Sequence, residues 1–166
     1  MWARIHWPKP IQVTINSLFA KLYKINTSEA KEPLESFKSL SDFFIRELKD
    51  GARPISGEIV HPCDATLSVS AKIKSDTLIQ NKLNSYYIND FLRLNVDDQL
   101  VDGHQLTYYL SPQDYHRVHV PMDSKLVSIK HISGTLWPVN KWAVKNIDQL
   151  FCVNERIVFK LSLIHI

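Results

Sequence analysis

Hydrophobic positions near the N-terminus repeat at helical spacing. Between residues 10 and 24 apolar side chains recur three and four residues apart, which places them on one face of a helix. This stripe consists of Ile11, Ile15, Leu18, Phe19, Leu22 and Tyr23. Lys21 and Lys24 lie beside it, and Trp2 and Trp7 precede it. A basic amphipathic helix with flanking tryptophans is typical of a membrane interface. A helix packed on its own domain would show the same stripe, so both interpretations stay open.

A second helix is expected from Leu40 to Asp50. Ser39 or Ser41 can cap its start, because a serine hydroxyl accepts a hydrogen bond from a free amide of the first turn. Gly51 follows at the place where a C-terminal cap is expected. The two predicted helices would form an N-terminal helical layer.

From residue 66 the hydrophobic period changes from helical to alternating. Over residues 66–73 Leu67, Val69, Ala71 and Ile73 alternate with polar residues, which predicts a half-buried strand. A brief helix is expected over 88–94, and further short strands are expected at 107–110, 117–120, 127–132 and 156–160. The predicted fold class is α+β, with N-terminal amphipathic helices followed by a mostly antiparallel β core.

Composition and charge exclude several classes of protein. Of 166 residues, 45% are hydrophobic and 22% charged, so the chain is neither disordered nor fibrous. No apolar run reaches the roughly 18–20 residues that span a bilayer. The net charge of +3 combines basic residues 1–25 with an acidic stretch at 89–114, and no nucleic-acid partner is expected. Two cysteines, Cys63 and Cys152, form neither a disulfide framework nor a zinc cluster.

The densest group of polar and aromatic residues is YYLSPQDYHRVHVP, at 108–121. Its Ser-Pro start predicts one helical turn over 112–115, followed by the strand at 117–120. His116 and His119 can then reach one cleft and transfer protons near neutral pH. The alternative is one structural and one exposed histidine. A metal site is not expected, because two histidines without a nearby carboxylate or thiolate are a poor ligand set.

A second candidate element, HPCDA at 61–65, precedes the alternating strand. Asp64 can form a turn there, or it can fix the tautomer of a histidine as a triad carboxylate does. Cys63 is a poor nucleophile, because it lacks a flanking cation and the neighbouring carboxylate raises the pKa of its thiol. From the residues alone, the chain offers one acid and two bases without a convincing nucleophile.

Four blocks of sequence, taken together, carry a family resemblance. They are LSDFFIRELKDGARPI at 40–55, HPCDA at 61–65, LSPQDYHRVHVP at 110–121, and GTLWPVN at 134–140 with NIDQLFCVNER at 146–156. The chain resembles the phosphatidylserine decarboxylase proenzymes, pyruvoyl-dependent carboxy-lyases of phospholipid biosynthesis. The resemblance implies conversion of phosphatidylserine to phosphatidylethanolamine and carbon dioxide.

The resemblance also implies roles for the candidate residues. Members of that family cleave themselves, and a serine near the C-terminus becomes the pyruvoyl cofactor of a small subunit. Asp64 and His119 match the family residues of the cleavage step, with His119 as base and Asp64 as its orienting partner. His116 matches the histidine implicated in decarboxylation, where the pyruvoyl group is the electron sink. Ala65 stands where the family usually has glycine; if the position requires a positive φ, alanine costs about 1 kcal/mol.

One part of the family pattern is missing. No glycine follows Gly134, so the Gly-Ser-Thr-type cleavage motif and the pyruvoyl-forming serine are absent from this sequence. We therefore expect a C-terminally truncated proenzyme that is inactive alone, with an incomplete β core over residues 51–160. Residues 161–166, LSLIHI, are expected to be a non-native tail, because they fit no family block and match the translation of a transposon end used in library preparation.

A lipid substrate favours the interfacial interpretation of residues 1–50 as a membrane-associating region. The first residues, MWARIHWPKP, have no apolar core of a signal peptide. The expected partners are phosphatidylserine, a membrane surface and the pyruvoyl-bearing small subunit of the same proenzyme. The expected location is peripheral, on the cytoplasmic face of a bacterial inner membrane. The alternative is a non-enzymatic, membrane-surface-binding relic that keeps the fold without the chemistry.

Overall fold

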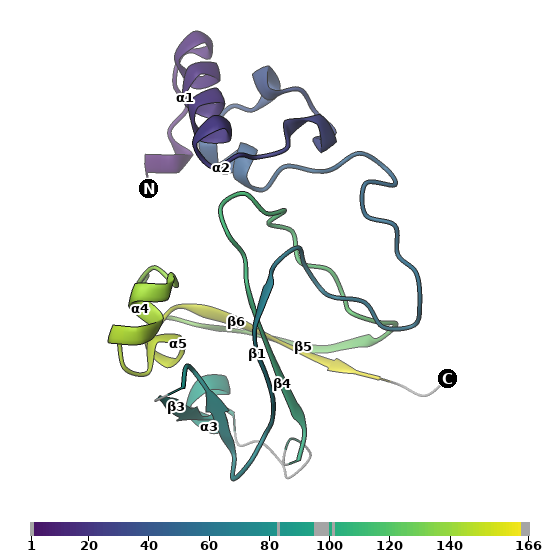
Figure 1. The fold of residues 1–166 in the computed structure, drawn as a ribbon, viewed down its shortest axis with the longest axis vertical. Helices are drawn as coiled ribbons and strands as arrows, with labels where there is room; N and C mark the ends of the chain where they lie inside the picture. Colours follow the sequence, from purple (N-terminus) through teal and green to yellow (C-terminus); the bar gives the residue numbers. More distant parts are fainter. Residues whose placement is uncertain (1, 83, 95–99, 101, 164–166) are drawn as a thin grey trace. The chain divides into compact units, whose positions relative to one another are not determined.

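The computed structural model describes residues 2–82, 84–94, 100 and 102–163. Residues 95–99 of the acidic stretch and 164–166 of the expected tail lie outside the described residues. The chain forms two compact units (Figure 1). The first unit consists of residues 1–66 and 110–123, and the second of residues 67–109 and 124–166. The predicted functional division at residue 50 stays a prediction.

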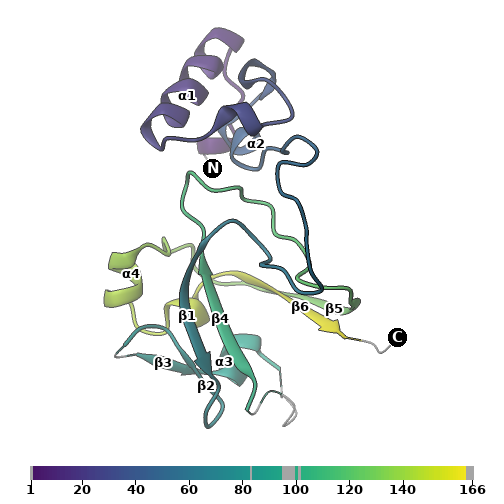
Figure 2. The same ribbon diagram turned by 45° about the vertical axis from the view of Figure 1, so that its right-hand side comes forward.

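Apart from the first residue of a strand, the regular elements of the first unit in the described residues are helices, and the rest of the unit is loop (Figure 2). Its elements are η1 (Trp2–Arg4), α1 (Lys9–Leu22), η2 (Thr27–Glu29), η3 (Leu34–Ser36) and α2 (Leu40–Phe44). α1 confirms the helix predicted at 10–24, and it begins with proline in its first turn, where no amide partner is needed. The core of this unit is an apolar cluster of Ala20, Ile25, Leu40 and Phe43.

Two of the three side chains that α1 buries are polar. Gln12 and Asn16 are 3% and 0% exposed, whereas Leu18 and Leu22 of the predicted stripe are 66% and 69% exposed. Gln12 Nε2 donates to Asn16 Oδ1 at 2.8 Å and Asn16 Nδ2 donates to the Phe37 carbonyl at 3.4 Å, whereas Gln12 Oε1 is buried without a partner among the described residues. Phe19 is the member of the stripe that packs against the apolar cluster. Most of the apolar stripe therefore faces outward.

α2 is shorter than the predicted helix at 40–50. Ser39 is its cap as expected, and its hydroxyl accepts a hydrogen bond from the Asp42 amide at 3.0 Å. The helix ends at Phe44 because the following residues pair with residues 29–31 instead. The Lys31 amide donates to the Glu47 carbonyl at 2.9 Å, and the Lys49 amide donates to the Glu29 carbonyl at 2.8 Å. The prediction of a helix through residue 50 was wrong, and the predicted cap Gly51 lies in a later turn.

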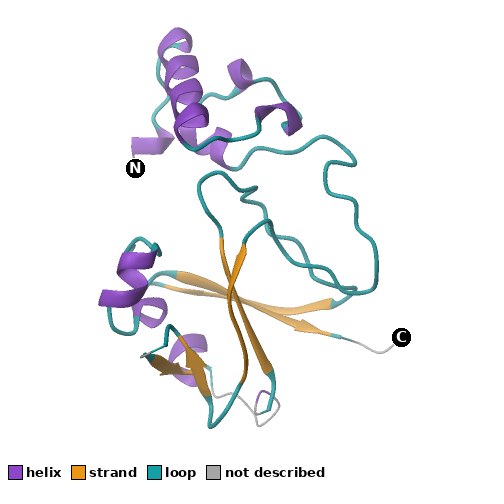
Figure 3. Cartoon of the chain, in the orientation of Figure 1, coloured by secondary structure: helices purple, strands orange, loops and turns teal. Residues whose placement is uncertain are grey.

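The second unit is built from strand pairs (Figure 3). In the described part of the chain, β1 (Thr66–Lys72) pairs with β4 (His104–Tyr109), β2 (Thr77–Ile79) with β3 (Ser85–Tyr87), and β5 (Lys125–Ile132) with β6 (Arg156–Ser162). The register of β2–β3 and of β5–β6 is antiparallel. β1 and β4 also run in opposite directions, because contacts join Ser68 to Thr107 and Ile73 to Gly103.

Several predicted elements are present in this unit. Val69 and Ala71 of β1 are half-buried and Ile73, just after the strand, is buried, whereas Ser68 and Ser70 are exposed, which confirms the alternation over 68–73. Leu67, expected on the buried face, is 43% exposed. α3 (Ile88–Leu92) confirms the helix at 88–94, and β4, β5 and β6 confirm three of the short strands. The pattern missed β2, β3, α4 (Lys141–Asn146) and α5 (Leu150–Val153), which are all short. The α+β fold class is confirmed.

β6 includes the first two residues of the expected tail. Leu161 pairs with Leu126, and Ser162 pairs with Lys125. Strand pairing uses backbone groups that every non-proline residue carries, so this pairing does not depend on where the residues come from. The foreign origin of 161–166 stays a prediction.

Two of the family-like blocks meet at Asn154, which is 9% exposed. Its Oδ1 accepts hydrogen bonds from the Trp137 amide at 3.0 Å and the Thr135 hydroxyl at 2.9 Å, and its Nδ2 donates to the Trp137 carbonyl at 2.8 Å. A Cβ at Gly134 would lie 2.6 Å from the Asn154 carbonyl carbon, so only glycine fits. The blocks at 134–140 and 146–156 therefore specify a single packed junction.

Candidate active site

The histidine-bearing segment, residues 110–121, begins with a closed turn. The Asp114 carboxylate accepts a hydrogen bond from the Ser111 amide at 2.7 Å, and the Asp114 amide donates to the Ser111 carbonyl at 2.9 Å. These two bonds close a turn, and no helix forms at the predicted 112–115. The chain then leaves in an extended conformation rather than as the strand predicted at 117–120. Both predictions were wrong, because side-chain and loop contacts take the place of regular pairing here.

His116 is held between a ring and a carbonyl. Its imidazole stacks on Phe44, with ring centroids 3.9 Å apart and an interplanar angle of 32°. Its Nε2 lies 2.9 Å from the Ser111 carbonyl oxygen. A carbonyl only accepts hydrogen bonds, so Nε2 carries the hydrogen and Nδ1 keeps the lone pair in the neutral ring. Burial lowers the pKa of His116 below its ordinary value of 6.5, and it outweighs the opposing effects of the Ser111 carbonyl and Asp114.

His119 lies on the same segment with an exposed side chain. Its ring lies beside that of buried Tyr115, with centroids 5.6 Å apart. Its amide donates to the Pro62 carbonyl at 2.7 Å, and the Val60 amide donates to the Pro121 carbonyl at 2.8 Å. The segment that carries His119 is thus tied by its backbone to the block that carries Asp64.

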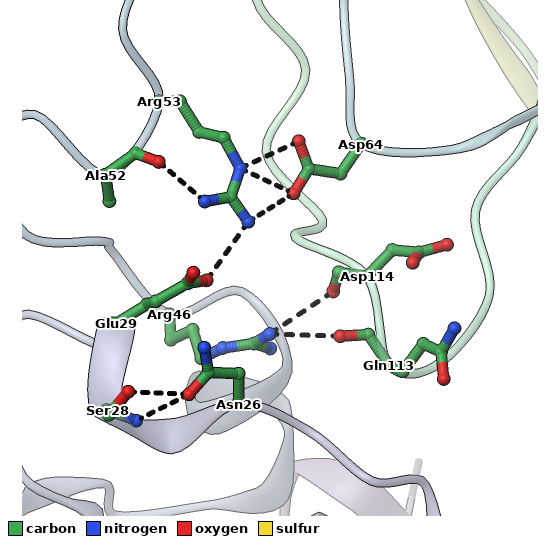
Figure 4. Close-up of polar contacts among 9 residues, drawn as sticks. All are labelled: Asn26, Ser28, Glu29, Arg46, Ala52, Arg53, Asp64, Gln113 and Asp114. Carbon is green, nitrogen blue, oxygen red and sulfur yellow. Dashed lines mark hydrogen bonds and ion pairs between the residues drawn. The ribbon is translucent and has the colours of Figure 1, made fainter.

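Asp64 is bound by an arginine that sequence reasoning did not single out (Figure 4). Arg53 Nε lies 3.0 and 2.8 Å from the two Asp64 carboxylate oxygens, and Arg53 Nη2 lies 2.7 Å from Oδ2. The same Nη2 lies 3.1 Å from Glu29 Oε2. The hydrogen bond that Arg53 donates to Asp64 is the largest of the effects that raise the pKa of Arg53. Arg53 therefore fixes the carboxylate and ties it to Glu29.

The contact implied between Asp64 and His119 is not among the hydrogen bonds found in the described residues. The structure brings Asp64, His116 and His119 into one unit, and it joins the Asp64 block to His119 through the Pro62 carbonyl. The orienting role of Asp64 stays a prediction. Ala65 does not have a positive φ, so this departure from the family pattern causes no backbone strain here.

Residues 45–47 and 113–117 each contain one arginine that binds the other stretch. We refer to this pair of arginines as the arginine clamp. Arg46, 4% exposed, donates through Nη2 to the Gln113 and Asp114 carbonyls at 3.3 and 3.4 Å (Figure 4). In return, Arg117 donates through Nε to the Ile45 carbonyl at 2.8 Å and through Nη1 to the Glu47 carboxylate at 2.9 Å. His116 lies between residues 113–114, which Arg46 binds, and Arg117. The clamp therefore fixes the backbone on both sides of His116.

The clamp has an unusual cost at Arg46. Its Nε and Nη1 are buried and have no hydrogen-bond partner among the described residues. Its guanidinium lies 5.6 Å from the centre of the Phe43 ring, a cation–π distance. Burial lowers the pKa of Arg46. A buried cation with unpaired donors is destabilising on its own, so its position must be imposed by the surrounding packing.

The remaining candidates of the site add little nucleophilic or metal-binding capacity. Burial first, and then the Asp64 and Asp114 carboxylates, raise the pKa of the Cys63 thiol, as expected for a poor nucleophile. Among the residues that the structure describes, no group of three or more histidine, cysteine or acidic side chains is placed to hold a metal ion. The two imidazoles of the segment are groups that can transfer protons near neutral pH.

Comparison with known proteins decides the family. Residues 40–164 match the family profile described as phosphatidylserine decarboxylase. The chain belongs to the phosphatidylserine decarboxylase family. This result confirms the family expected from the four sequence blocks, and the family is one of carboxy-lyases. All three candidate residues and both arginines of the clamp lie inside the matched range.

Curated relatives of the phosphatidylserine decarboxylase family carry the name phosphatidylserine decarboxylase proenzyme. The protein of Pseudoalteromonas translucida is 40% identical over 89% of this chain and 54% of its own length. The protein of Francisella philomiragia is 43% identical over 86% of this chain and 51% of its own length. The protein of Aliivibrio salmonicida is 37% identical over 94% of this chain and 55% of its own length. The chain therefore spans about half the length of the curated relatives it matches.

We expect Arg46→Met to change the free energy of unfolding by less than about 1 kcal/mol, because relief of a buried, partly unpaired cation offsets two long hydrogen bonds. The partners of Arg46 are neutral carbonyls, so its removal leaves no unpaired buried charge. The same substitution should shift the imidazole signals of His116, since residues 113 and 114 lose their anchor. Urea unfolding followed by circular dichroism, together with ¹⁵N-edited NMR of the ring, measures both effects.

Arg117→Met is the matched control for this prediction. The two hydrogen bonds of Arg117 are short and its side chain is 42% exposed. The free energy of unfolding of this variant should therefore fall by about 1 kcal/mol, because no buried charge is relieved in compensation. A loss of more than about 3 kcal/mol in Arg46→Met would show that the buried arginine stabilises the fold, contrary to the prediction.

The lowered pKa of His116 predicts a pH dependence of stability. The unfolded chain binds a proton at this residue at a higher pH than the folded chain, so folding is disfavoured as the pH falls. The contribution of neutral His116 to the free energy of unfolding is complete above about pH 6.5, the ordinary pKa of histidine. It is lost as the pH falls from there through the folded-state pKa. NMR titration of the His116 ring, first in buffer and then in 8 M urea, tests this directly. A folded-state pKa equal to or above the value in urea would contradict it.

Proposed function

We propose that these residues form the large-subunit half of a pyruvoyl-dependent phosphatidylserine decarboxylase that cleaves itself. The observation that carries the proposal is the family match over residues 40–164, which contains Asp64, His116 and His119. The arginine clamp and the Arg53–Asp64 pair support it, because general acid–base chemistry requires side chains that are held in place.

The donor set of the site fits a pyruvoyl group brought by the small subunit. The reaction needs groups that take and return protons, and two imidazoles on one clamped segment can do this near neutral pH. When bound, the group supplies an electron-withdrawing carbonyl for loss of carbon dioxide. The chain itself supplies proton transfer and substrate positioning.

The two histidines are suited to different steps. His119 is exposed, so its ring is accessible to the hydroxyl of an incoming serine and can take that proton in self-cleavage. In the assembled proenzyme, Asp64 would orient this ring while Arg53 holds the carboxylate. His116 has a lowered pKa and its lone pair on Nδ1, so this atom would first take a proton from the ammonium group of the substrate and then return it to the carbon that has lost the carboxyl group.

A chimera tests the catalytic proposal. Residues 1–160 are joined to the C-terminal half of the Pseudoalteromonas translucida relative, and cleavage is followed on a denaturing gel. We expect His119→Ala and Asp64→Ala to block cleavage. His116→Ala should cleave normally but release carbon dioxide from carboxyl-labelled phosphatidylserine about 10²–10⁴ times more slowly, the usual contribution of a general acid or base.

His131→Ala is the control, since this histidine lies on β5 and pairs with Glu155. It should cleave and react like the unmodified chimera. Uncleaved His116→Ala protein would show that the two histidines are assigned in the wrong order. A chimera that neither cleaves nor reacts, beside an active intact relative, would favour the non-enzymatic relic.

We also propose that α1 attaches the protein peripherally to the cytoplasmic face of a bacterial inner membrane. In the part of the chain that the structure describes, no helix is both long and apolar enough to pass through a bilayer. The outward face of α1 supports attachment at the surface, because Ile11, Leu18 and Leu22 are 49%, 66% and 69% exposed. Lys21 on the same helix favours anionic lipid.

Vesicle flotation tests the membrane proposal. The 166-residue chain should float with vesicles containing 30 mol% phosphatidylglycerol, and Leu18→Asp should reduce the bound fraction at least threefold, because it places a charge on the apolar face. Ile59→Asp is the matched control, since Ile59 is 71% exposed in the same unit but outside α1. Equal effects of both substitutions would contradict attachment through α1.

A further inference from the structure

One face of the β5–β6 sheet is apolar and exposed. Residues directly opposite each other in an antiparallel pair share a face, and so do residues two apart along a strand. The register pairs Leu126 with Leu161 and Ile129 with Phe159, so these four residues lie on one face together with Ile157. Leu126, Ile129, Ile157 and Phe159 are each between 49% and 59% exposed. We refer to these four exposed residues as the apolar sheet face.

The opposite face of the same sheet packs within the second unit. Arg156 lies on it, and its guanidinium donates to the Phe91 carbonyl of α3 at 2.6 Å and to the Cys152 carbonyl of α5 at 2.7 Å. Lys130 lies on the same face and donates to the Arg93 carbonyl, just after α3. The short helices therefore anchor the sheet by this face and leave the apolar sheet face exposed.

The charge pattern of the sheet favours a protein partner over a lipid surface. All the lysines and arginines of β5 and β6 lie on the opposite face, namely Lys125, Lys130, Arg156 and Lys160. A site for anionic lipid would need such cations beside the apolar residues. The apolar sheet face instead ends in a polar pair, since His131 Nε2 and Glu155 Oε1 lie 3.3 Å apart beside Ile157. An uncharged apolar centre with a polar rim is typical of a protein–protein interface.

The sheet also needs a second layer. A two-stranded sheet is at best marginally stable in water, and it becomes stable when its apolar face packs against another element. Exposed contiguous apolar surface marks a place where another structure binds. The apolar sheet face is therefore a surface that requires a partner.

We propose that the apolar sheet face is the docking surface for the small-subunit half of the proenzyme, an assignment that rests on the proposed function. The chain spans 54% of the Pseudoalteromonas translucida relative, so nearly half of such a protein remains to act as this partner. Under the proposed function, the small-subunit half follows β6 in the sequence. Consecutive elements are usually neighbours in space, because a short connection costs little conformational entropy. Ile129 and Phe159 form the centre of the surface, and His131 at the rim contributes little to it.

Cysteine labelling tests whether the surface is covered. Ile129→Cys is introduced into the 166-residue chain and into the chimera of residues 1–160 with the Pseudoalteromonas translucida half. The rate of maleimide attachment is measured by mass spectrometry of the peptide that contains position 129. Labelling should be at least about tenfold slower in the chimera, because the small-subunit half covers this position. Tyr87→Cys is the control, since Tyr87 is 60% exposed on β3 of the same unit and should be labelled equally fast in both proteins.

A second pair of substitutions tests the contribution of the surface to stability. Phe159→Asp should change the Tm of the 166-residue chain by less than about 2 °C, because this side chain is 59% exposed. In the chimera it should lower the Tm by about 5 °C or more, because the charge is buried against the small-subunit half. Tyr87→Asp should have the same small effect in both proteins. Equal effects of Phe159→Asp in the 166-residue chain and in the chimera would overturn the docking surface.

The docking surface and the proposed function can fail separately. A chimera that cleaves and releases carbon dioxide, but labels position 129 as fast as the 166-residue chain, would overturn the docking surface and leave the proposed function standing. A chimera that protects position 129 but neither cleaves nor reacts would support the docking surface and overturn the catalytic proposal.

Two other occupants are distinguished by the same label. Protection of position 129 in the 166-residue chain that increases with protein concentration would assign the apolar sheet face to a second copy of the chain. Protection by phosphatidylglycerol vesicles, without protection in the chimera, would assign it to a lipid surface. Either result would overturn the proposal.

Discussion

The arginine clamp between residues 45–47 and 113–117 is the constraint on which the candidate site depends. The histidine-bearing segment has no regular sheet to hold it, since residues 115–120 are extended without an assigned strand. Arg46 and Arg117 replace the missing ladder with side-chain bonds to carbonyls and to Glu47. The clamp thereby holds the backbone around His116 beside residues 45–47, which directly follow Phe44, and the His116 ring stacks on Phe44.

Arg53 extends the same arrangement to the third candidate residue. It binds both oxygens of Asp64 and reaches Glu29, whose carbonyl also pairs with Lys49. The family-like block at 40–55 thus contributes Phe44, Arg46 and Arg53. These residues position their neighbours in the site, whereas the blocks at 61–65 and 110–121 carry the candidate catalytic residues.

The sequence predicted elements whose signal is local. The existence of α1, the half-buried face of β1 at Val69 and Ala71, and the Ser39 cap all depend on neighbouring residues, and all are present. The outward direction of the α1 stripe could not be predicted, because periodicity shows that residues share a face without showing what covers it. The arginine roles were also hidden, since their main partners are backbone carbonyls, which every residue has. Asp64, His116 and His119 were found through the family blocks rather than through geometry.

The first unit buries polar groups and exposes apolar ones to an unusual degree. Gln12, Asn16 and Arg46 are buried. Gln12 and Arg46 each have a buried polar atom without a partner among the described residues, and Asn16 Nδ2 makes only a long hydrogen bond. Leu18 and Leu22 lie outside, where burial would have stabilised the fold. A fold selected for stability alone would reverse both features. Both are reasonable if the inside of this unit must hold the segment of the candidate histidines while its outside meets lipid, because the exposed apolar side chains then acquire a partner that the isolated chain lacks.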